Sequence, residues 1–127
     1  MLLVPVEVHR SAIHGLGVFA LRCIAKGTVV WSFTPGFDLD LDPKLLDEQP
    51  AHFRQVLFHY GYIDPRLNRF ILCCDDARFM NHSDAPNLRI DPHADRHGVD
   101  VAVRDIEAGE ELTIDYASIE GSRPSRS

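Results

Sequence analysis

The chain has 127 residues, of which 45% are hydrophobic and 25% are charged, and its formal net charge at pH 7 is -6. This length allows one domain with one modest core, and the composition is typical of a globular protein. The acidic balance disfavours direct nucleic-acid binding and suits a cationic partner. Because no apolar run approaches the length of a membrane span and the first residues lack the features of a signal peptide, we expect a soluble intracellular protein without a membrane partner.

The first third of the chain predicts short strands separated by glycine and proline turns. Valines alternate with other residues at the start, and a β-rich run surrounds Trp31, which predicts strands over 4–8, 18–21 and 28–33. Gly15 and Gly17 are expected to break the stretch before the second strand, and Pro35-Gly36 is expected to end the third.

A helical segment follows. Asp42 and Pro43 form a plausible helix start, with Asp42 as the cap. Pro50 either interrupts this helix or begins a second one. Apolar residues then recur at helical spacing, at Phe53, Val56, Leu57 and Tyr60. Gly61 is expected to end the segment.

Strands return in the second half of the chain, over 69–74, 88–90, 99–103 and 112–114. Asp76 is a candidate cap for a single helical turn over 77–80. Many short strands with one helical insert predict a mainly β domain over 1–120. Residues 121–127 are expected to form a flexible tail.

Three cysteines are present, and two of them, Cys73 and Cys74, adjoin. An odd number with an adjacent pair does not favour a disulfide framework, so we expect buried thiols that fill a strand. His93 and His97 have the spacing of two metal ligands on a helix, but Pro92 and Gly98 bracket them and favour a loop. We predict no metal site.

The most informative segment is 78–83, in which Asn81, His82 and Ser83 directly follow an apolar Phe-Met pair. Small polar side chains of this kind bond to the backbone or to a ligand where a chain turns. Pro86-Asn87 comes next, and the later segment 109–116 carries one phenol, that of Tyr116, to the end of a sheet. Together they predict a ligand-binding site with a catalytic or gating hydroxyl.

These residues resemble the SET domain, the family of S-adenosylmethionine-dependent protein-lysine methyltransferases. Three further segments fit the family pattern in the same order, at 15–20, 24–29 and 106–111. A lone glycine motif would be weak, but ordered motifs with sensible spacing are specific. The resemblance covers the chain from about Val6 to Tyr116. It implies a β-clip domain of short curved sheets whose C-terminal segment threads under a loop as a pseudoknot.

The resemblance also implies roles for individual residues. Cofactor binding falls to Gly15, Leu16, Gly17, Arg78, Phe79, Asn81, His82 and Tyr116. Tyr116 is the catalytic phenol, and Tyr60 is a second catalytic candidate that lines the lysine channel with Tyr62. Core packing remains an alternative for Tyr60, as does packing at a sheet end for Tyr116. Glu110 and Glu111 are interpreted as turn and strand-face residues, and Asp115 is ambiguous.

As a function, the resemblance implies an S-adenosyl-L-methionine-dependent protein-lysine N-methyltransferase that acts on a basic protein such as a histone tail. The product is S-adenosyl-L-homocysteine, and no metal is needed. The alternative is a non-catalytic module that binds cofactor or a basic peptide. Like the minimal viral and bacterial members, the sequence lacks the zinc segments before and after the domain, which leaves the cofactor pocket open on one side. The tail could fold over the pocket, a second subunit could supply the missing wall, or catalysis could be weak; of these we expect the second, a homodimer. The expected compartment is the cytoplasm if the chain is bacterial, and otherwise the nucleus or cytoplasm.

An acidic stretch precedes and enters the helical segment, at Asp38, Asp40, Asp42, Asp47 and Glu48. Such a stretch could attract a lysine-rich peptide, but for any individual residue a solvated loop is the favoured interpretation. The sequence leaves both interpretations open.

Overall fold

The computed structural model describes residues 1–115, and this part of the chain forms four small sheets and three short helices. The strands are β1 (Val6–Arg10), β2 (Leu16–Ala20), β3 (Val29–Ser32), β4 (Leu39–Leu41), β5 (Gly61–Asp64), β6 (Arg69–Leu72), β7 (Asn81–His82), β8 (Leu88–Asp91), β9 (Val99–Ala102) and β10 (Thr113–Ile114). The helices are α1 (Lys44–Asp47), α2 (Ala51–Tyr60) and the 3-10 helix η1 (Asp76–Phe79).

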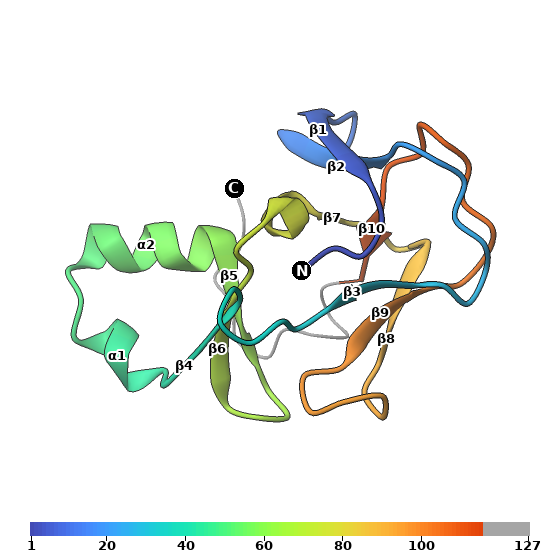
Figure 1. Cartoon of the computed structure of the whole chain (residues 1–127). Helices are drawn as coiled ribbons and strands as arrows, with labels where there is room; N and C mark the ends of the chain where they lie inside the picture. Colours follow the sequence, from blue (N-terminus) through green and yellow to red (C-terminus); the bar gives the residue numbers. More distant parts are fainter. Residues whose placement is uncertain (116–127) are drawn as a thin grey trace.

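The four sheets have the orders β1-β2, β3-β9-β8, β4-β6-β5 and β10-β7. The first three are antiparallel, whereas β7 and β10 pair in parallel. Figure 1 shows α1, α2 and the β4-β6-β5 sheet on one side of the molecule and the β3-β9-β8 sheet on the other. The β1-β2 hairpin lies at the top of this view, and β7 and β10 lie between it and the β3-β9-β8 sheet. The predicted mainly β architecture is confirmed.

One apolar cluster joins the hairpin, the β3-β9-β8 sheet and the two-stranded parallel sheet. Its buried members are Val18, Ala20, Ile24, Val30, Met80, Leu88, Ala102, Ile106, Leu112 and Ile114. Burying each of the larger aliphatic side chains contributes about 1.5–3 kcal/mol. Because Met80 and Ile114 belong to this cluster, the core fixes the residue before β7 and the last residue of β10.

Two of the three strands in the β4-β6-β5 sheet were not predicted. Both β4 and β5 obtain their ladder hydrogen bonds from β6, so their structure depends on a partner distant in sequence. Gly61 ends α2 as expected, yet it also begins β5. A Cβ atom at Gly61 would lie 2.3 Å from the ring of Phe70 and 2.7 Å from the carbonyl oxygen of Ile71, so only glycine fits this close approach.

Two other element predictions were partly wrong. Gly17 lies inside β2 rather than breaking the stretch before it. The cap of η1 is Asp75, whose Oδ1 accepts a hydrogen bond of 3.1 Å from the Ala77 amide, and not Asp76. The predicted 99–103 and 112–114 strands match β9 and β10 to within a residue or two, because their alternating pattern is strong.

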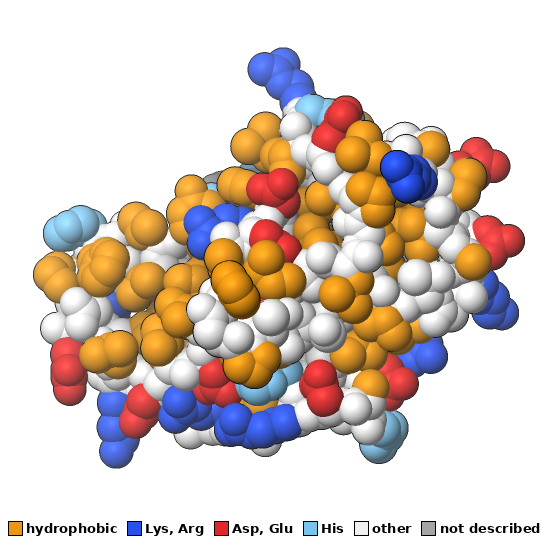
Figure 2. All heavy atoms as spheres, viewed as in Figure 1, with side chains coloured by type: hydrophobic (Ala, Val, Ile, Leu, Met, Phe, Trp, Pro, Cys, Tyr) orange, Lys and Arg blue, Asp and Glu red, His pale blue; other side chains and the backbone are white. Residues whose placement is uncertain are grey.

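The helical insert consists of two helices, with Pro50 at the N-cap of α2. The predicted helical spacing of the apolar residues is present in α2, but no residue of this helix is buried, and Phe53 and Val56 are 43% and 50% exposed. Figure 2 shows apolar side chains gathered over this end of the molecule. No helix within residues 1–115 has the length and apolar character needed to cross a membrane.

The cysteine prediction was only partly right. All three thiols are free, but of the adjacent pair only Cys73 is buried, while Cys74 is exposed and Cys23 is exposed as well. The pair follows the end of β6 instead of filling the strand. Burial raises the pKa of the Cys73 thiol far above its usual value, so this thiol stays protonated and behaves as an apolar core group.

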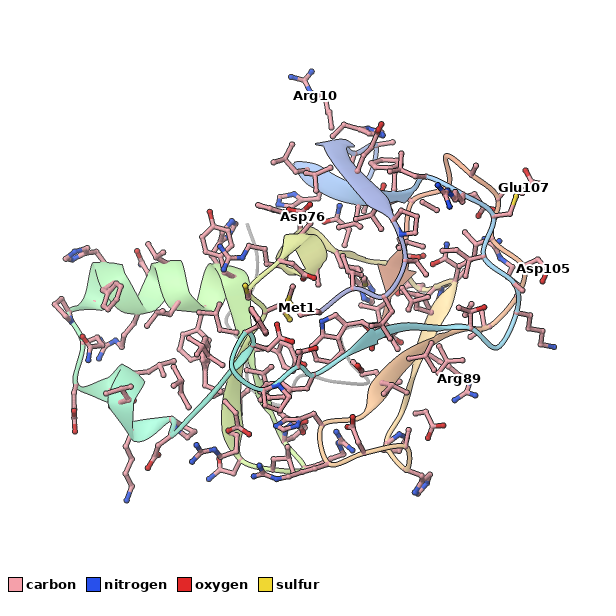
Figure 3. The ribbon with its side chains drawn as sticks, viewed as in Figure 1. Met1, Arg10, Asp76, Arg89, Asp105 and Glu107 are labelled. Atoms are coloured by element: carbon pink, nitrogen blue, oxygen red, sulfur yellow. The ribbon has the colours of Figure 1, made fainter. Side chains whose placement is uncertain are left out.

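The acidic stretch divides into internal and external groups. Asp38 is buried, and its carboxylate accepts hydrogen bonds from the amides of Thr34 and Cys74 and from the amino group of Met1, which Figure 3 labels. Asp40 bonds to the guanidinium of Arg69. Three members, Asp42, Asp47 and Glu48, are exposed. Only these three remain available to an external cation.

Asp40 fastens the loop between β8 and β9 to the β4-β6-β5 sheet. Its Oδ2 lies 2.7 Å from Nε2 of His97 and 3.2 Å from the Arg96 guanidinium. The His97 ring stacks on Phe33 at 3.8 Å. The pair His93 and His97 is therefore in a loop, as predicted, and no group of three potential metal ligands occurs within residues 1–115.

We expect Asp40→Asn to lower the free energy of unfolding by about 1–3 kcal/mol at pH 7, because charge-assisted hydrogen bonds are lost. Burial raises the pKa of Asp40, but the hydrogen bonds from Arg69 and His97 outweigh it and hold the pKa below its usual value. The carboxylate therefore stabilises the fold above about pH 4, and this contribution disappears as the pH falls further. Urea denaturation at pH 7 and pH 3 measures it.

Exposed Asp47 supplies the matched control, and Asp47→Asn should change stability by less than about 0.5 kcal/mol. If the Asp40 variant differs equally from the wild type at both pH values, the charge of Asp40 is not what stabilises the loop.

Candidate active site

The parallel pair β7–β10 brings together two segments that are far apart in the sequence. Thr113 lies opposite Asn81, and Ile114 lies opposite His82. The Ser83 amide extends the pairing with a hydrogen bond of 3.1 Å to the carbonyl of Ile114. The predicted convergence of the 81–83 turn with the last strand is thus present up to residue 115.

Asn87 holds the last strand from its other side. Its Nδ2 donates to the carbonyl of Glu111 at 2.8 Å, and its Oδ1 accepts from the Thr113 amide at 2.9 Å. Segment 111–113 is therefore held by β7 on one side and by the loop before β8 on the other. This arrangement fits the pseudoknot that the family resemblance implied.

The side chain of Asn81 is the centre of a second polar group, the Asn81 cluster, formed by Ser11, His14, Leu16, Asn81 and Glu111. Nδ2 of Asn81 lies 3.0 Å from the carbonyl oxygens of His14 and Leu16 and 2.9 Å from Oε2 of Glu111. Ser11 Oγ donates to Oε1 of Glu111 at 2.7 Å. Because Asn81 is only 3% exposed, these bonds fix its amide, and they connect β7 to the start of β2.

The two glycines of the N-terminal motif serve different purposes. Gly15 has φ +47° and nothing within 4 Å of the place where a Cβ would be, so it is required by its backbone conformation. A Cβ atom at Gly17 would lie 2.4 Å from Oε2 of Glu111. Within the described residues, Gly17 therefore leaves room for the Glu111 carboxylate.

We expect Gly17→Ala to lower stability by about 1–3 kcal/mol, because the new methyl group displaces the Glu111 carboxylate from Asn81 and Ser11. In a Glu111→Ala background this cost should fall well below its wild-type value. Urea denaturation of the four proteins in this double-mutant cycle measures the coupling.

Gly15→Ala serves as the control, because its cost of about 1 kcal/mol arises from the positive φ alone and should be the same in both backgrounds. Equal costs of Gly17→Ala in the two backgrounds would show that the carboxylate does not occupy this space.

A neighbouring group joins three of the predicted residues from two helices, and we call it the Tyr60 cluster: Tyr60, Arg78 and Phe79. The Arg78 guanidinium lies 4.8 Å from the centroid of the Tyr60 ring and donates to the Cys73 carbonyl at 3.1 Å. Phe79 meets the Tyr60 ring edge to face at 6.1 Å. These contacts hold the end of α2 against η1.

Other predicted residues are placed less directly. Tyr62 lies on β5 opposite Ile71. His82 is half-buried, and its ring nitrogens lie 2.9 Å from Asp84 and 3.5 Å from Asp115. Tyr116 lies outside the described residues, so its predicted position next to the Asn81–His82 turn is not tested.

Three residues of this site make side-chain contacts that the sequence did not predict: Ser11, Glu111 and Asn87. Glu111 and Glu110 are adjacent and identical in type, but hydrogen bonds from Arg104 and the Glu107 amide hold the pKa of Glu110 below its usual value. Glu111 points to the Asn81 cluster instead. Alternation along the last strand was the one signal that could have separated them.

Comparison with known proteins agrees with this geometry. The family model described as "SET domain" matches residues 15–117, and the chain belongs to the SET domain family. It is similar to histone-lysine N-methyltransferase 2B of Homo sapiens, with 32% identity over 87% of this chain and 4% of the relative.

A second relative is an H3 lysine-4 specific histone-lysine N-methyltransferase of Neurospora crassa, with 29% identity over 88% of this chain and 9% of that protein. The chain thus spans less than a tenth of these relatives. A solved structure of a candidate histone methyltransferase from Plasmodium falciparum has a TM-score of 0.63 at 24% identity, over 89% of this chain and 93% of that one. That structure supports the fold.

Proposed function

We propose that the chain is an S-adenosyl-L-methionine-dependent protein-lysine N-methyltransferase whose substrate is a basic protein such as a histone tail. The observation that carries the proposal is the Asn81 cluster, in which the glycine motif, the Asn-His-Ser turn and the final motif meet. The similarity to histone-lysine methyltransferases supports the same reaction.

The chemistry of the Asn81 cluster fits this cofactor. Two hydrogens on Nδ2 of Asn81 face three protein acceptors, which leaves Oδ1 as the atom of this amide that can receive a ligand donor. Together with the Glu111 carboxylate and the carbonyls of His14 and Leu16, it forms an acceptor-rich site suited to a cation. When bound, the cofactor supplies a methyl group activated on a sulfonium.

The Tyr60 cluster would receive the lysine. A free lysine has a pKa near 10.4, so roughly one in 10³ is neutral at pH 7, and only the neutral amine is nucleophilic. An aromatic site with the Arg78 cation over one ring disfavours the ammonium form. In this proposal the Tyr116 hydroxyl orients the amine, which places donor and acceptor in line about 3 Å apart.

Charge supports a basic partner for this site. The chain carries a net charge of -6, and the exposed carboxylates of Asp42, Asp47 and Glu48 lie on the helical insert or directly before it. Such a surface attracts a lysine-rich segment and repels nucleic acid. Homodimerisation and the cellular compartment stay predictions.

Transfer of a labelled methyl group to a panel of basic proteins, followed by mass spectrometry of the products, tests the proposal. Label on lysine side chains is the expected result. Calorimetric titration with S-adenosylmethionine is run in parallel. Binding without transfer to any member of the panel would favour the non-catalytic module, and the absence of both would contradict the assignment.

A further inference from the structure

The Glu111 carboxylate is held from three directions. Ser11 Oγ donates to Oε1 at 2.7 Å, and Nδ2 of Asn81 donates to Oε2 at 2.9 Å. Gly17 leaves the space in which the carboxylate lies, since a Cβ there would come within 2.4 Å of Oε2. A half-buried side chain with both oxygens bonded has little freedom to turn away from the site.

The charge of this carboxylate is not neutralised by its contacts. Both donors are neutral groups, and within residues 1–115 no lysine, arginine or histidine forms an ion pair with Glu111. The adjacent Glu110 differs, because Arg104 pairs with it at 2.8 Å. Carbonyl oxygens of His14 and Leu16 lie within 3.0 Å of the same Asn81 nitrogen, so the Asn81 cluster has a negative potential.

The methyl-transfer reaction changes the charge of the cofactor. The lone pair of the lysine nitrogen forms the new carbon–nitrogen bond, the electrons of the carbon–sulfur bond return to sulfur, and the surplus proton on nitrogen leaves to solvent. The sulfonium therefore becomes a neutral thioether. A fixed, partly buried negative charge favours the first species over the second, because water screens it incompletely.

We propose that Glu111 is a specificity-determining residue that makes the Asn81 cluster bind the positively charged sulfonium donor in preference to its neutral thioether product. This inference rests on the proposed function. It assigns to Glu111 a role in exchanging spent cofactor for fresh cofactor, whereas its hydrogen bonds alone would assign it only a structural role.

Glu111→Gln tests the inference, because glutamine keeps the shape and an acceptor oxygen but removes the charge. Calorimetric titration measures the affinities for S-adenosylmethionine and S-adenosylhomocysteine without any turnover. We expect the donor to bind about tenfold more weakly and the product less than threefold more weakly. Glu110→Gln, whose carboxylate pairs with Arg104, is the matched control and should leave the affinity ratio unchanged.

A second measurement uses the wild-type protein and decides the matter if the variant does not fold. The ratio of the two affinities should fall about twofold between 50 mM and 1 M salt, because salt screens a partly buried charge only in part. Equal weakening of both ligands by Glu111→Gln, or a ratio independent of salt, overturns the inference and leaves the proposed function intact. A wild-type protein that binds neither ligand overturns both.

Discussion

Asn81→Asp is expected to lower the free energy of unfolding by about 3–5 kcal/mol at pH 8 and to abolish measurable cofactor binding. The substitution keeps the shape of the side chain but replaces the NH₂ group by an oxygen. That oxygen would face two carbonyls at 3.0 Å and the Glu111 carboxylate at 2.9 Å. Three favourable contacts thus become repulsive in a residue that is 3% exposed.

The pH dependence of this variant gives a sharper test. Burial and the neighbouring carboxylate raise the pKa of the introduced acid above its value in the unfolded chain. The deficit in stability therefore grows as the pH rises through that raised pKa and shrinks towards pH 5. Urea denaturation at pH 5 and pH 8 checks both statements.

Asn68→Asp is the control, because Asn68 is exposed and has a φ of +51° that aspartate also tolerates. It should cost less than about 1 kcal/mol at either pH. A loss as small as this for Asn81→Asp would mean that the Asn81 amide does not hold the three segments together.

Tyr116→Phe is expected to lower methyl transfer about 10²-fold or more while changing the affinity for S-adenosylmethionine less than about threefold. The reason is that a single positioned hydroxyl acts on the amine and methyl group chiefly in the transition state, and removing such a group costs about this much. Single-turnover transfer of a labelled methyl group measures the rate, and calorimetry measures the affinity.

Tyr60→Phe tests the second candidate for the catalytic hydroxyl by the loss of methyl transfer that it causes. The contacts described for Tyr60 involve its ring, over which Arg78 lies and against which Phe79 packs, and phenylalanine retains that ring. We therefore expect a loss of less than tenfold. If Tyr60→Phe costs more than Tyr116→Phe, the catalytic roles of the two tyrosines are reversed.

The sequence was most informative where a pattern is local. Strands β8, β9 and β10 and the division of the helical insert at Pro50 follow from alternation and from proline. The family motifs identified Asn81 and the glycine pair as one site, and the structure joins them through hydrogen bonds. The SET fold was therefore predictable, as was the proximity of Asn81 to the glycine motif.

What could not be predicted depends on partners distant in sequence. Strands β4 and β5 exist through β6, and Gly17 is glycine because of a side chain that follows much later in the chain. Glu110 and Glu111 are adjacent and chemically identical, yet Glu110 pairs with Arg104 whereas Glu111 belongs to the Asn81 cluster.

The hydrogen bonds that join Glu111 to earlier parts of the chain have a consequence for the order of folding. The hydrogen bond between Asn81 and Glu111 joins residues that are 30 positions apart in the sequence. The hydrogen bond between Ser11 and Glu111 joins residues that are 100 positions apart. Non-local contacts form slowly, since chain entropy is lost before they stabilise anything. During synthesis on the ribosome, the glycine motif and the Asn-His-Ser turn emerge before Glu111, so under the proposed function a nascent chain would bind the cofactor only after its final strand has docked.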